Sequence, residues 1–557
     1  MKHKDNAMMA NVEEAVSMIR AAQHEDGYIN SYYTVRGINR RWENLRDRHE
    51  LYCLGHLVEA CVAYEMLTRS GRLLEPVMKA IRHVDSLFGD APGKLRGYPG
   101  HQEIEIGLLR LHELTRDPLP LKLATYFLLE RGRHDEKGLI YFDHEAMARE
   151  GDTYDDLGPD MKSWYQHARD YQYHQADCVI SQATEVKGHA VRAMYYYTAA
   201  TDLVRLTGDE DIWIALCRLW RDLVDTKLLI TGGIGTIRQW EGFGPQYFLG
   251  DTEEDGTCYA ETCASFALIN WCQRMLRLSL IGEYGDVMEV SLYNAFLGAV
   301  GLDGVSFYYQ NPLKTMTGCF KERSRWFEVA CCPPNVAKLL GQMGSIIYSF
   351  HEGLIVVHLF IASTFTVPNT NVVISQTTSM PWSGEVNIQV QGTTRVALRI
   401  PDWAGGFTCS IEGRQKNNYL YIPAAKDHHI KLTLPISPRK VYANPKTNKD
   451  EVCIMRGPLV YCLEDVDNTL NVDHLALTDA PLTEGEPISI SSVDCVVPVI
   501  ARARELANSN WSSLYGQQPW RYKEEEVELQ FIPYCFRANR GGNGGMRTWM
   551  RRFQVGA

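Results

Sequence analysis

The sequence predicts a multidomain protein in which an all-helical half is followed by a β-rich half. The chain has 557 residues, which is more than one ordinary domain holds. Up to about Ser349, apolar residues recur at helical spacing, as in HELYCLGHLVEACVAYEML and GHAVRAMYYYTAATDLVRL. From about Gly353 onward the period changes to two, in runs such as LIVVHLFIAS and RVALRIP, which is typical of a β-sandwich.

Gly- and Pro-rich breaks, including GYPGH, TGGIGT and GFGP, divide the helical half into many antiparallel helices. Paired helices of similar length fit a closed helical toroid, and we expect residues 1–349 to form one helical domain. In the β-rich half we expect a β-sandwich over residues 350–445 and a second one over residues 446–557. The glycine cluster GGNGG at 541–545 is expected to be a loop between late strands.

Composition excludes several classes of protein. Apolar residues make up 45% and charged residues 22%, as in a globular protein that is not embedded in a membrane, and no apolar run approaches the roughly 18–20 residues of a membrane span. The net charge of -11 argues against a non-specific nucleic-acid binder. The first residues carry no apolar secretory segment, so we expect a cytoplasmic protein. Fifteen cysteines are too sparse for a disulfide scaffold, so clustered cysteines indicate metal ligands or nucleophiles.

The strongest local pattern joins ETCAS at 261–265 with ACCPPN at 330–335. A carboxylate and three sulfurs make a complete tetrahedral shell for zinc, and two prolines directly after the cysteine pair would stiffen its backbone. On spacing alone three interpretations stay open: unrelated core residues, a structural zinc site and a catalytic zinc site. The residues concerned are Glu261, Cys263, Cys331 and Cys332.

A second candidate is Glu241, which lies in the aromatic, Gly-rich segment GGIGTIRQWEGFGPQYFLGD. Desolvation by Trp240, Phe243 and Tyr247 would suit this carboxyl group to act as a general acid. The alternative is an ordinary loop carboxylate in water. The segment resembles neither a phosphate-binding loop nor a dinucleotide fingerprint.

Several histidines lie at the expected ends of helices. One histidine on an apolar face is usually a core residue, but a group of them fits a pocket that hydrogen-bonds a polyol. Tyrosines in FYYQNPL would add an aromatic surface on which sugars stack. The histidines are His49 and His56, seven residues apart on one helix face, His101 and His189.

The motifs HELYCLGH, GYPGHQEIE, GHAVRAMY, GGIG followed by WEGFG, YAETCAS, FYYQNPL, CCPPN, LRIPDWA and RGPLVYCLE occur in this order. With them the sequence resembles the β-L-arabinofuranosidase family of glycoside hydrolases, family 127, and its relative family 146, from about residue 13 to the C-terminus. The resemblance implies an (α/α)6 toroid that carries the active site, followed by β-sandwich domains. It also implies a zinc ion (Zn²⁺) held by one glutamate and three cysteines, one of which is the nucleophile.

Carried over residue by residue, the resemblance assigns the zinc shell to Glu261, Cys263, Cys331 and Cys332. It makes Cys331 the nucleophile and Glu241 the general acid/base, and it assigns the sugar contacts to His49, His101, His189 and Tyr309. The expected function is a retaining exo-glycosidase that releases a furanosyl sugar, above all β-L-arabinofuranose, from a small carbohydrate or glycoside. A non-catalytic zinc-stabilised carbohydrate-binding relative and a toroid-fold sugar epimerase or isomerase are the alternatives. We expect no nucleic-acid or membrane partner, and the β-sandwich would offer a surface for a homodimer.

Two departures from the family pattern bear on these expectations. Family members carry a long stretch before the motif AAQHEDGYIN, which here begins at Ala21, so we expect the toroid to lack its first helices. Acidic insertions, GDTEEDG between Glu241 and Glu261 and AREGDTYDDLGPD around 148–162, would add negative charge near the helical face.

Overall fold

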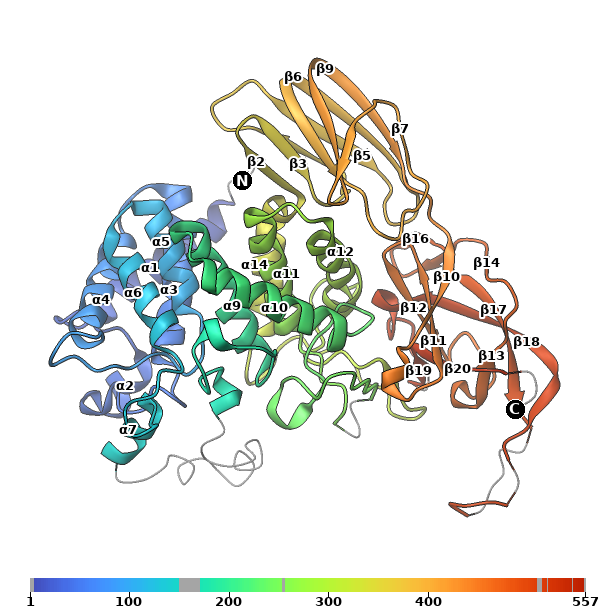
Figure 1. Cartoon of the computed structure of the whole chain (residues 1–557), viewed down its shortest axis with the longest axis horizontal. Helices are drawn as coiled ribbons and strands as arrows, with labels where there is room; N and C mark the ends of the chain where they lie inside the picture. Colours follow the sequence, from blue (N-terminus) through green and yellow to red (C-terminus); the bar gives the residue numbers. More distant parts are fainter. Residues whose placement is uncertain are drawn as a thin grey trace. The chain divides into compact units, whose positions relative to one another are not determined.

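The computed structural model describes residues 5–149, 171–252, 256–507, 513–517, 519–542 and 544–554. The chain forms two compact units, Met1–Leu223 and Val224–Ala557. The predicted order of a helical part followed by a β-rich part is confirmed, because the described α-helices end with Ile347 and strands dominate from Tyr348 onward (Figure 1). None of the helices in the described ranges has both the length and the apolar character needed to cross a membrane.

The first unit contains helices and short 3-10 turns in its described residues. Helix α9 is its central element, since every residue from Ala190 to Val204 is buried. Helix α5 packs against α3, α6 and α9, and α3 also packs against α4. The helices are α1 Asn6–Ala22, α2 Ser31–Arg36, α3 Glu50–Thr68, α4 Leu74–Leu87, α5 Ile104–Thr115, α6 Pro118–Glu130, α7 Tyr141–Ala148, α9 Ala190–Thr207 and α10 Glu210–Thr226, which crosses into the second unit.

Two glycines allow α3 and α5 to touch backbone to backbone. A Cβ atom at Gly55 would lie 2.5 Å from the backbone nitrogen of Ile104, and one at Gly107 would lie 2.9 Å from the carbonyl oxygen of Gly55. Neither position can carry a side chain without moving a helix. The contact fixes the N-terminal ends of both helices; α3 directly follows His49, and α5 begins three residues after His101.

The second unit begins with a smaller group of helices. Helix α11 packs against α12 and α14, and a π-helical turn, η6, extends α12. The elements are α11 Thr262–Leu278, α12 Gly282–Val290, η6 Ser291–Phe296, α13 Leu297–Ala299 and α14 Cys332–Ile347. A short strand, β1 Lys314–Thr315, lies between α13 and α14 in the sequence.

The first β region is an eight-stranded sheet with the order β2-β3-β6-β5-β4, in which β9 pairs with β6, β7 and β8. Its long central strands β6 and β9 pair antiparallel, with two shifts of register between Val390 and Val396 that indicate bulges. The strands are β2 Tyr348–His351, β3 Leu354–Val357, β4 Ser363–Thr366, β5 Val373–Thr378, β6 Glu385–Arg399, β7 Thr408–Cys409, β8 Arg414–Lys416 and β9 Tyr419–Thr433.

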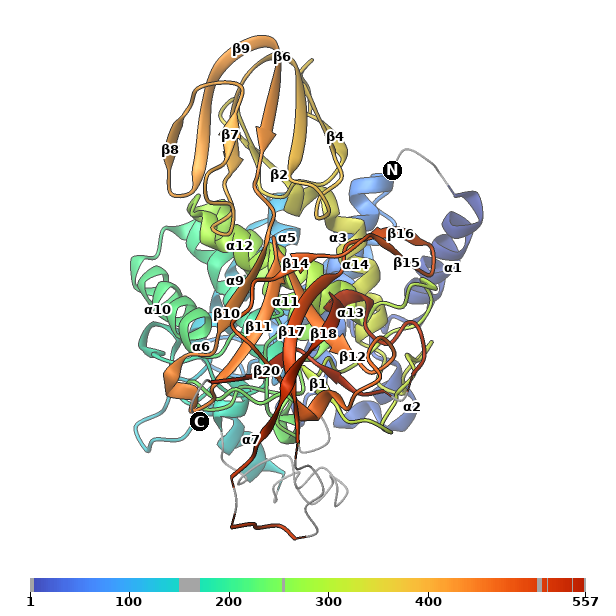
Figure 2. The same ribbon diagram turned by 90° about the vertical axis from the view of Figure 1, so that its right-hand side faces the viewer.

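The second β region is a ten-stranded sheet with the order β1-β19-β12-β18-β17-β13-β20-β11-β10, with β14 on β17. The antiparallel pair β17 and β18 runs through its middle (Figure 2). Strand β1 comes from the helical part of the chain and pairs with β19, Lys314 opposite Arg547. The remaining strands are β10 Pro438–Tyr442, β11 Glu451–Arg456, β12 Leu459–Glu464, β13 Leu475–Leu477, β14 Thr483–Glu484, β17 Val499–Leu506, β18 Tyr522–Pro533, β19 Met546–Arg547 and β20 Trp549–Arg552, and a separate pair is β15 Ile488–Ile490 with β16 Val493–Val496.

Candidate active site

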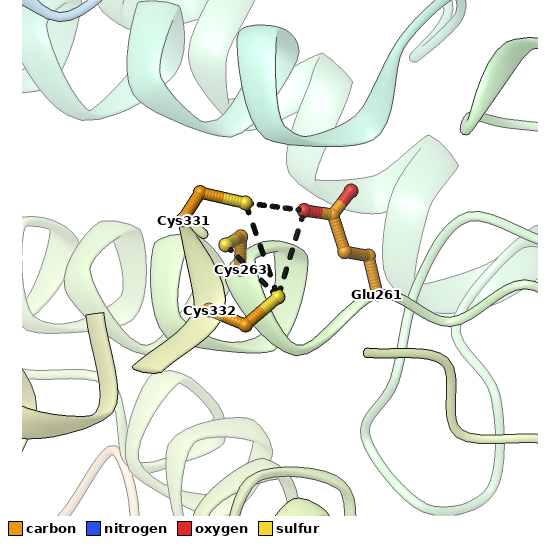
Figure 3. Close-up of side chains that lie close together, drawn as sticks. All are labelled: Glu261, Cys263, Cys331 and Cys332. Carbon is orange, nitrogen blue, oxygen red and sulfur yellow. Dashed lines mark hydrogen bonds between the residues drawn. The ribbon is translucent and has the colours of Figure 1, made fainter. Parts of the chain in front are cut away.

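Four side chains that are far apart in the sequence meet in the second unit, at the N-terminal ends of α11 and α14. Glu261 is the N-cap residue of α11 and Cys263 lies in its first turn. Cys331 is the N-cap residue of α14 and Cys332 is its first residue. Figure 3 shows all four side chains pointing toward one another. Because the N-terminal end of a helix carries partial positive charge, both helices favour anionic sulfur and oxygen here.

The distances within this cluster fit one metal ion. The Sγ atoms of Cys263 and Cys332 are 3.4 Å apart, and those of Cys331 and Cys332 are 3.9 Å apart. Oε1 of Glu261 lies 3.5 Å from the sulfur of Cys331 and 4.0 Å from that of Cys332. Zinc bonds of about 2.3 Å to sulfur give a tetrahedron with edges of about 3.8 Å. The separations therefore match the edges of such a shell.

The burial of the cluster also favours a bound cation, which would offset the cost of ionising its acidic groups. Glu261, Cys263 and Cys332 are all buried. Burial raises the pKa of the Glu261 carboxyl group and of the Cys263 and Cys332 thiols well above their usual values. Hydrogen bonds from the other two thiols lower the pKa of Cys331 to about 3. Oε2 of Glu261 is buried and has no hydrogen-bond partner within the described chain, so the donor set fits a thiophilic divalent metal such as zinc.

Glu241 stands beside this cluster in the same unit. It has a left-handed backbone (φ 52°), and one of its carboxylate oxygens lies within 4.8 Å of one of Glu261. The Tyr259 hydroxyl donates a hydrogen bond of 2.8 Å to Oε1 of Glu241. The ring of Tyr309 lies 6.2 Å from that of Tyr259, and its hydroxyl is 3.3 Å from the sulfur of Cys331. A carboxyl group and a thiol are thus held in one site, each in contact with a tyrosine.

The aromatic surroundings of Glu241 differ in part from those suggested by its neighbours in the sequence. The indole nitrogen of Trp240 donates to the carbonyl oxygen of Phe243, and the hydroxyl of Tyr247 accepts a hydrogen bond from Lys446. Tyr259, which the sequence did not single out, does bind the Glu241 carboxylate. Tyr259 is the first residue of the motif YAETCAS, and this position is the feature of the sequence that could have indicated its role.

The first unit brings three of the predicted histidines together by itself. His49 precedes α3, His101 lies in the loop before α5, and His189 is the N-cap residue of α9. The ring centroid of His101 lies 5.8 Å from that of His49 and 5.6 Å from that of His189. Tyr52 packs against His101 at 4.4 Å. His56, the fourth histidine of the pattern, is instead paired through Nδ1 with Glu103 at 2.9 Å.

Two of these histidines, His49 and His101, are held neutral by their surroundings. Desolvation by the surrounding protein and the nearby Arg192 guanidinium lower the pKa of His49 to about 4, although the residue still reaches solvent. Burial and the same guanidinium lower the pKa of His101 well below its usual value. Arg192 itself is fixed by a 2.9 Å bond to the carbonyl oxygen of Gly100 and by the ring of Tyr173, 4.7 Å away. A neutral imidazole offers one donor and one acceptor, which suits hydroxyl groups.

Both acidic insertions fall largely outside the residues that the structure describes. These are Glu253 to Asp255 of GDTEEDG and residues 150–162 of the insertion around 148–162.

Comparison with known proteins gives a consistent result over the whole chain. Models of the catalytic, middle and C-terminal domains of glycoside hydrolase family 127 β-L-arabinofuranosidases match residues 1–345, 354–436 and 438–551. The chain is 32% identical to a non-reducing end β-L-arabinofuranosidase of Bifidobacterium longum, covering 99% of this chain and 86% of the relative.

Solved structures agree. A family 127 β-L-arabinofuranosidase from Geobacillus stearothermophilus T6 superimposes with a TM-score of 0.89 at 36% identity, covering 99% of this chain and 87% of the other. A second family 127 β-arabinofuranosidase superimposes with a TM-score of 0.83 at 27% identity, covering 99% and 86% of the two chains.

Proposed function

Because this chain belongs to glycoside hydrolase family 127, we propose that it is a zinc-dependent retaining exo-glycosidase that releases β-L-arabinofuranose. The observation that carries the proposal is the position of Cys331, whose sulfur lies among Glu261, Cys263 and Cys332. Glu241 lies in the same site. A thiolate and a carboxyl group are the two reacting groups that double displacement at an anomeric carbon requires.

Glu261, Cys263, Cys331 and Cys332 would hold the metal, as their separations and burial support. Bound zinc would keep the Cys331 sulfur anionic at neutral pH and would make it a better leaving group in the second step.

In the first step the Cys331 sulfur attacks the anomeric carbon. A carbon–sulfur bond forms as the bond from that carbon to the leaving oxygen breaks, and Glu241 gives its proton to this oxygen. The sugar is then held as a thioether on Cys331. The hydrogen bond from Tyr259 occupies one oxygen of Glu241, so the other oxygen is the one that carries the proton.

In the second step Glu241, now a carboxylate, takes a proton from water. The water oxygen attacks the anomeric carbon, the carbon–sulfur bond breaks, and its electron pair returns to Cys331. Two inversions give retention of configuration. Tyr309, 3.3 Å from the sulfur, is placed to donate a hydrogen bond to it when it is anionic. His49, His101 and His189 are assigned to the sugar hydroxyls, and the lowered pKa values of His49 and His101 support neutral rings that both donate and accept.

The test is release of sugar from p-nitrophenyl β-L-arabinofuranoside by the reduced, zinc-loaded protein. The α-anomer and a β-L-pyranoside serve as controls, and Cys331→Ser is the matched variant. We expect turnover of the β-furanoside alone and its loss in Cys331→Ser. Full activity of Cys331→Ser would rule out the sulfur as nucleophile, and turnover of the α-anomer alone would overturn the substrate assignment.

A further inference from the structure

The segment that leads to Cys331 presents two large apolar side chains to solvent. Trp326 is 64% exposed and Val329 is 70% exposed. Phe327, which follows Trp326 in the sequence, is partly buried. A tryptophan holds more apolar surface than any other residue, so exposing it five residues before a reactive cysteine is not explained by packing.

This segment is anchored directly before Trp326. Phe307 and Ser324 exchange two backbone hydrogen bonds of 2.8 and 2.9 Å, and the Ser324 hydroxyl donates to the carbonyl oxygen of Trp326 at 2.6 Å. Just before them, Arg323 donates to the carbonyl oxygen of Arg537 at 3.1 Å and to that of Gly298 at 3.0 Å. The indole is therefore carried on a backbone that other parts of the second unit hold in place.

Its neighbour ties the segment to the reactive sulfur. The ring of Phe327 meets that of Tyr309 edge to face, with centroids 5.4 Å apart and an angle of 83°. The hydroxyl of Tyr309 in turn lies 3.3 Å from Sγ of Cys331. Phe327, the residue next to Trp326, is thus connected to the Cys331 sulfur through Tyr309.

We propose that Trp326 and Val329 form the platform on which the leaving group of the substrate rests, and that this leaving group is a second sugar ring. The inference rests on the proposed function, since it assumes that a sugar bond is broken at Cys331. An exo-acting enzyme encloses the sugar it releases, so the rest of the substrate extends toward solvent, and Trp326 and Val329 are exposed side chains within five residues of the sulfur. A sugar ring has a face of C–H groups that packs on an indole, and the exposed Arg325 and Glu328 provide a polar rim for its hydroxyls.

The experiment compares two substrates that release the same sugar. Methyl β-L-arabinofuranoside has a leaving group too small to reach the platform, whereas a disaccharide of β-L-arabinofuranose bonded to a second arabinose reaches it. Trp326→Ala should lower kcat/KM for the disaccharide about ten-fold and leave the methyl glycoside within about two-fold. Trp326→Phe should restore most of the loss.

Trp520→Ala is the matched control, because Trp520 is 50% exposed in the same unit and is covered by Arg551 at 4.3 Å. It should change neither substrate. Equal losses on both substrates in Trp326→Ala, or none on either, would overturn the platform.

If the proposed function is wrong, the wild-type protein cleaves neither substrate, which differs from every outcome above. A measurement of sugar binding then tests the platform. Saturation-transfer NMR with the uncleaved disaccharide should give a signal from its reducing-end ring with the wild-type protein that is lost in Trp326→Ala, and an unchanged signal would refute the platform.

Discussion

Tyr259→Phe tests whether Glu241 is the proton donor. The Tyr259 side chain is 4% exposed, and its hydroxyl donates a 2.8 Å hydrogen bond to Oε1 of Glu241. Phenylalanine keeps the ring and removes only this bond. As Glu241 gives up its proton it becomes a carboxylate, so the bond is stronger in the transition state than in the ground state.

The size of the effect follows from this single contact. A hydrogen bond to a charged group contributes about 1.5–3 kcal/mol, which corresponds to roughly a 10- to 150-fold loss in kcat/KM. The loss should be larger for a sugar leaving group than for p-nitrophenol, because nitrophenolate departs as a stable anion and needs less help from an acid.

The assay is kcat/KM with a disaccharide and with the p-nitrophenyl furanoside, beside thermal unfolding to confirm the fold. Tyr308→Phe is the matched control, since the hydroxyl of Tyr308 bonds instead to the carbonyl oxygen of Lys321 at 2.6 Å. Wild-type kinetics in Tyr259→Phe, or equal losses in both variants, would refute the role of Tyr259 in proton donation.

Three further outcomes are expected. Elemental analysis should find about one zinc per chain and much less in Cys263→Ala, and equal contents would exclude this cluster as the metal site. Because the pKa of His49 is lowered in the folded chain, the unfolded chain binds a proton between about pH 4 and 6.5 that the folded chain does not bind. Urea denaturation should therefore show the free energy of unfolding falling as the pH drops from about 6.5 to about 4. His49→Gln should flatten this decline, and an unchanged slope would contradict the prediction. Arg399 is fully buried and lies 2.7 Å from Glu289, so Arg399→Met should lower the free energy of unfolding by about 3–5 kcal/mol. The exposed Arg502→Met should cost less than about 1 kcal/mol, and similar values for both would contradict the buried pair.

The sequence predicted those features that depend on residues close together in the chain or on rare residue types. Apolar periods of 3.6 and 2 separated the helical from the β-rich part, because each period reflects which face of an element is buried. The cluster of Glu261, Cys263, Cys331 and Cys332 could be predicted because its residue types are rare and chemically specific. The contact of Tyr259 with Glu241 could not, because a tyrosine near an aromatic segment is common and its partner lies 18 residues away. The pairing of β1 with β19 joins residues more than 200 positions apart and leaves no trace in a two-residue strand.

The pairing of β1 with β19 gives the C-terminal sheet a supporting role for the helical part of the second unit. Met546 and Arg547 hold β1, and Arg537 donates hydrogen bonds to Gly298 and Asn311. Apolar residues on both sides of this contact, among them Leu313 and Ile532, share one core. The sheet is therefore scaffolding for the reactive segment rather than an independent appendage. Deleting the sheet would remove the strand that pairs with β1 and the carbonyl oxygen of Arg537 that binds Arg323, so the segment leading to Cys331 would lose part of its support.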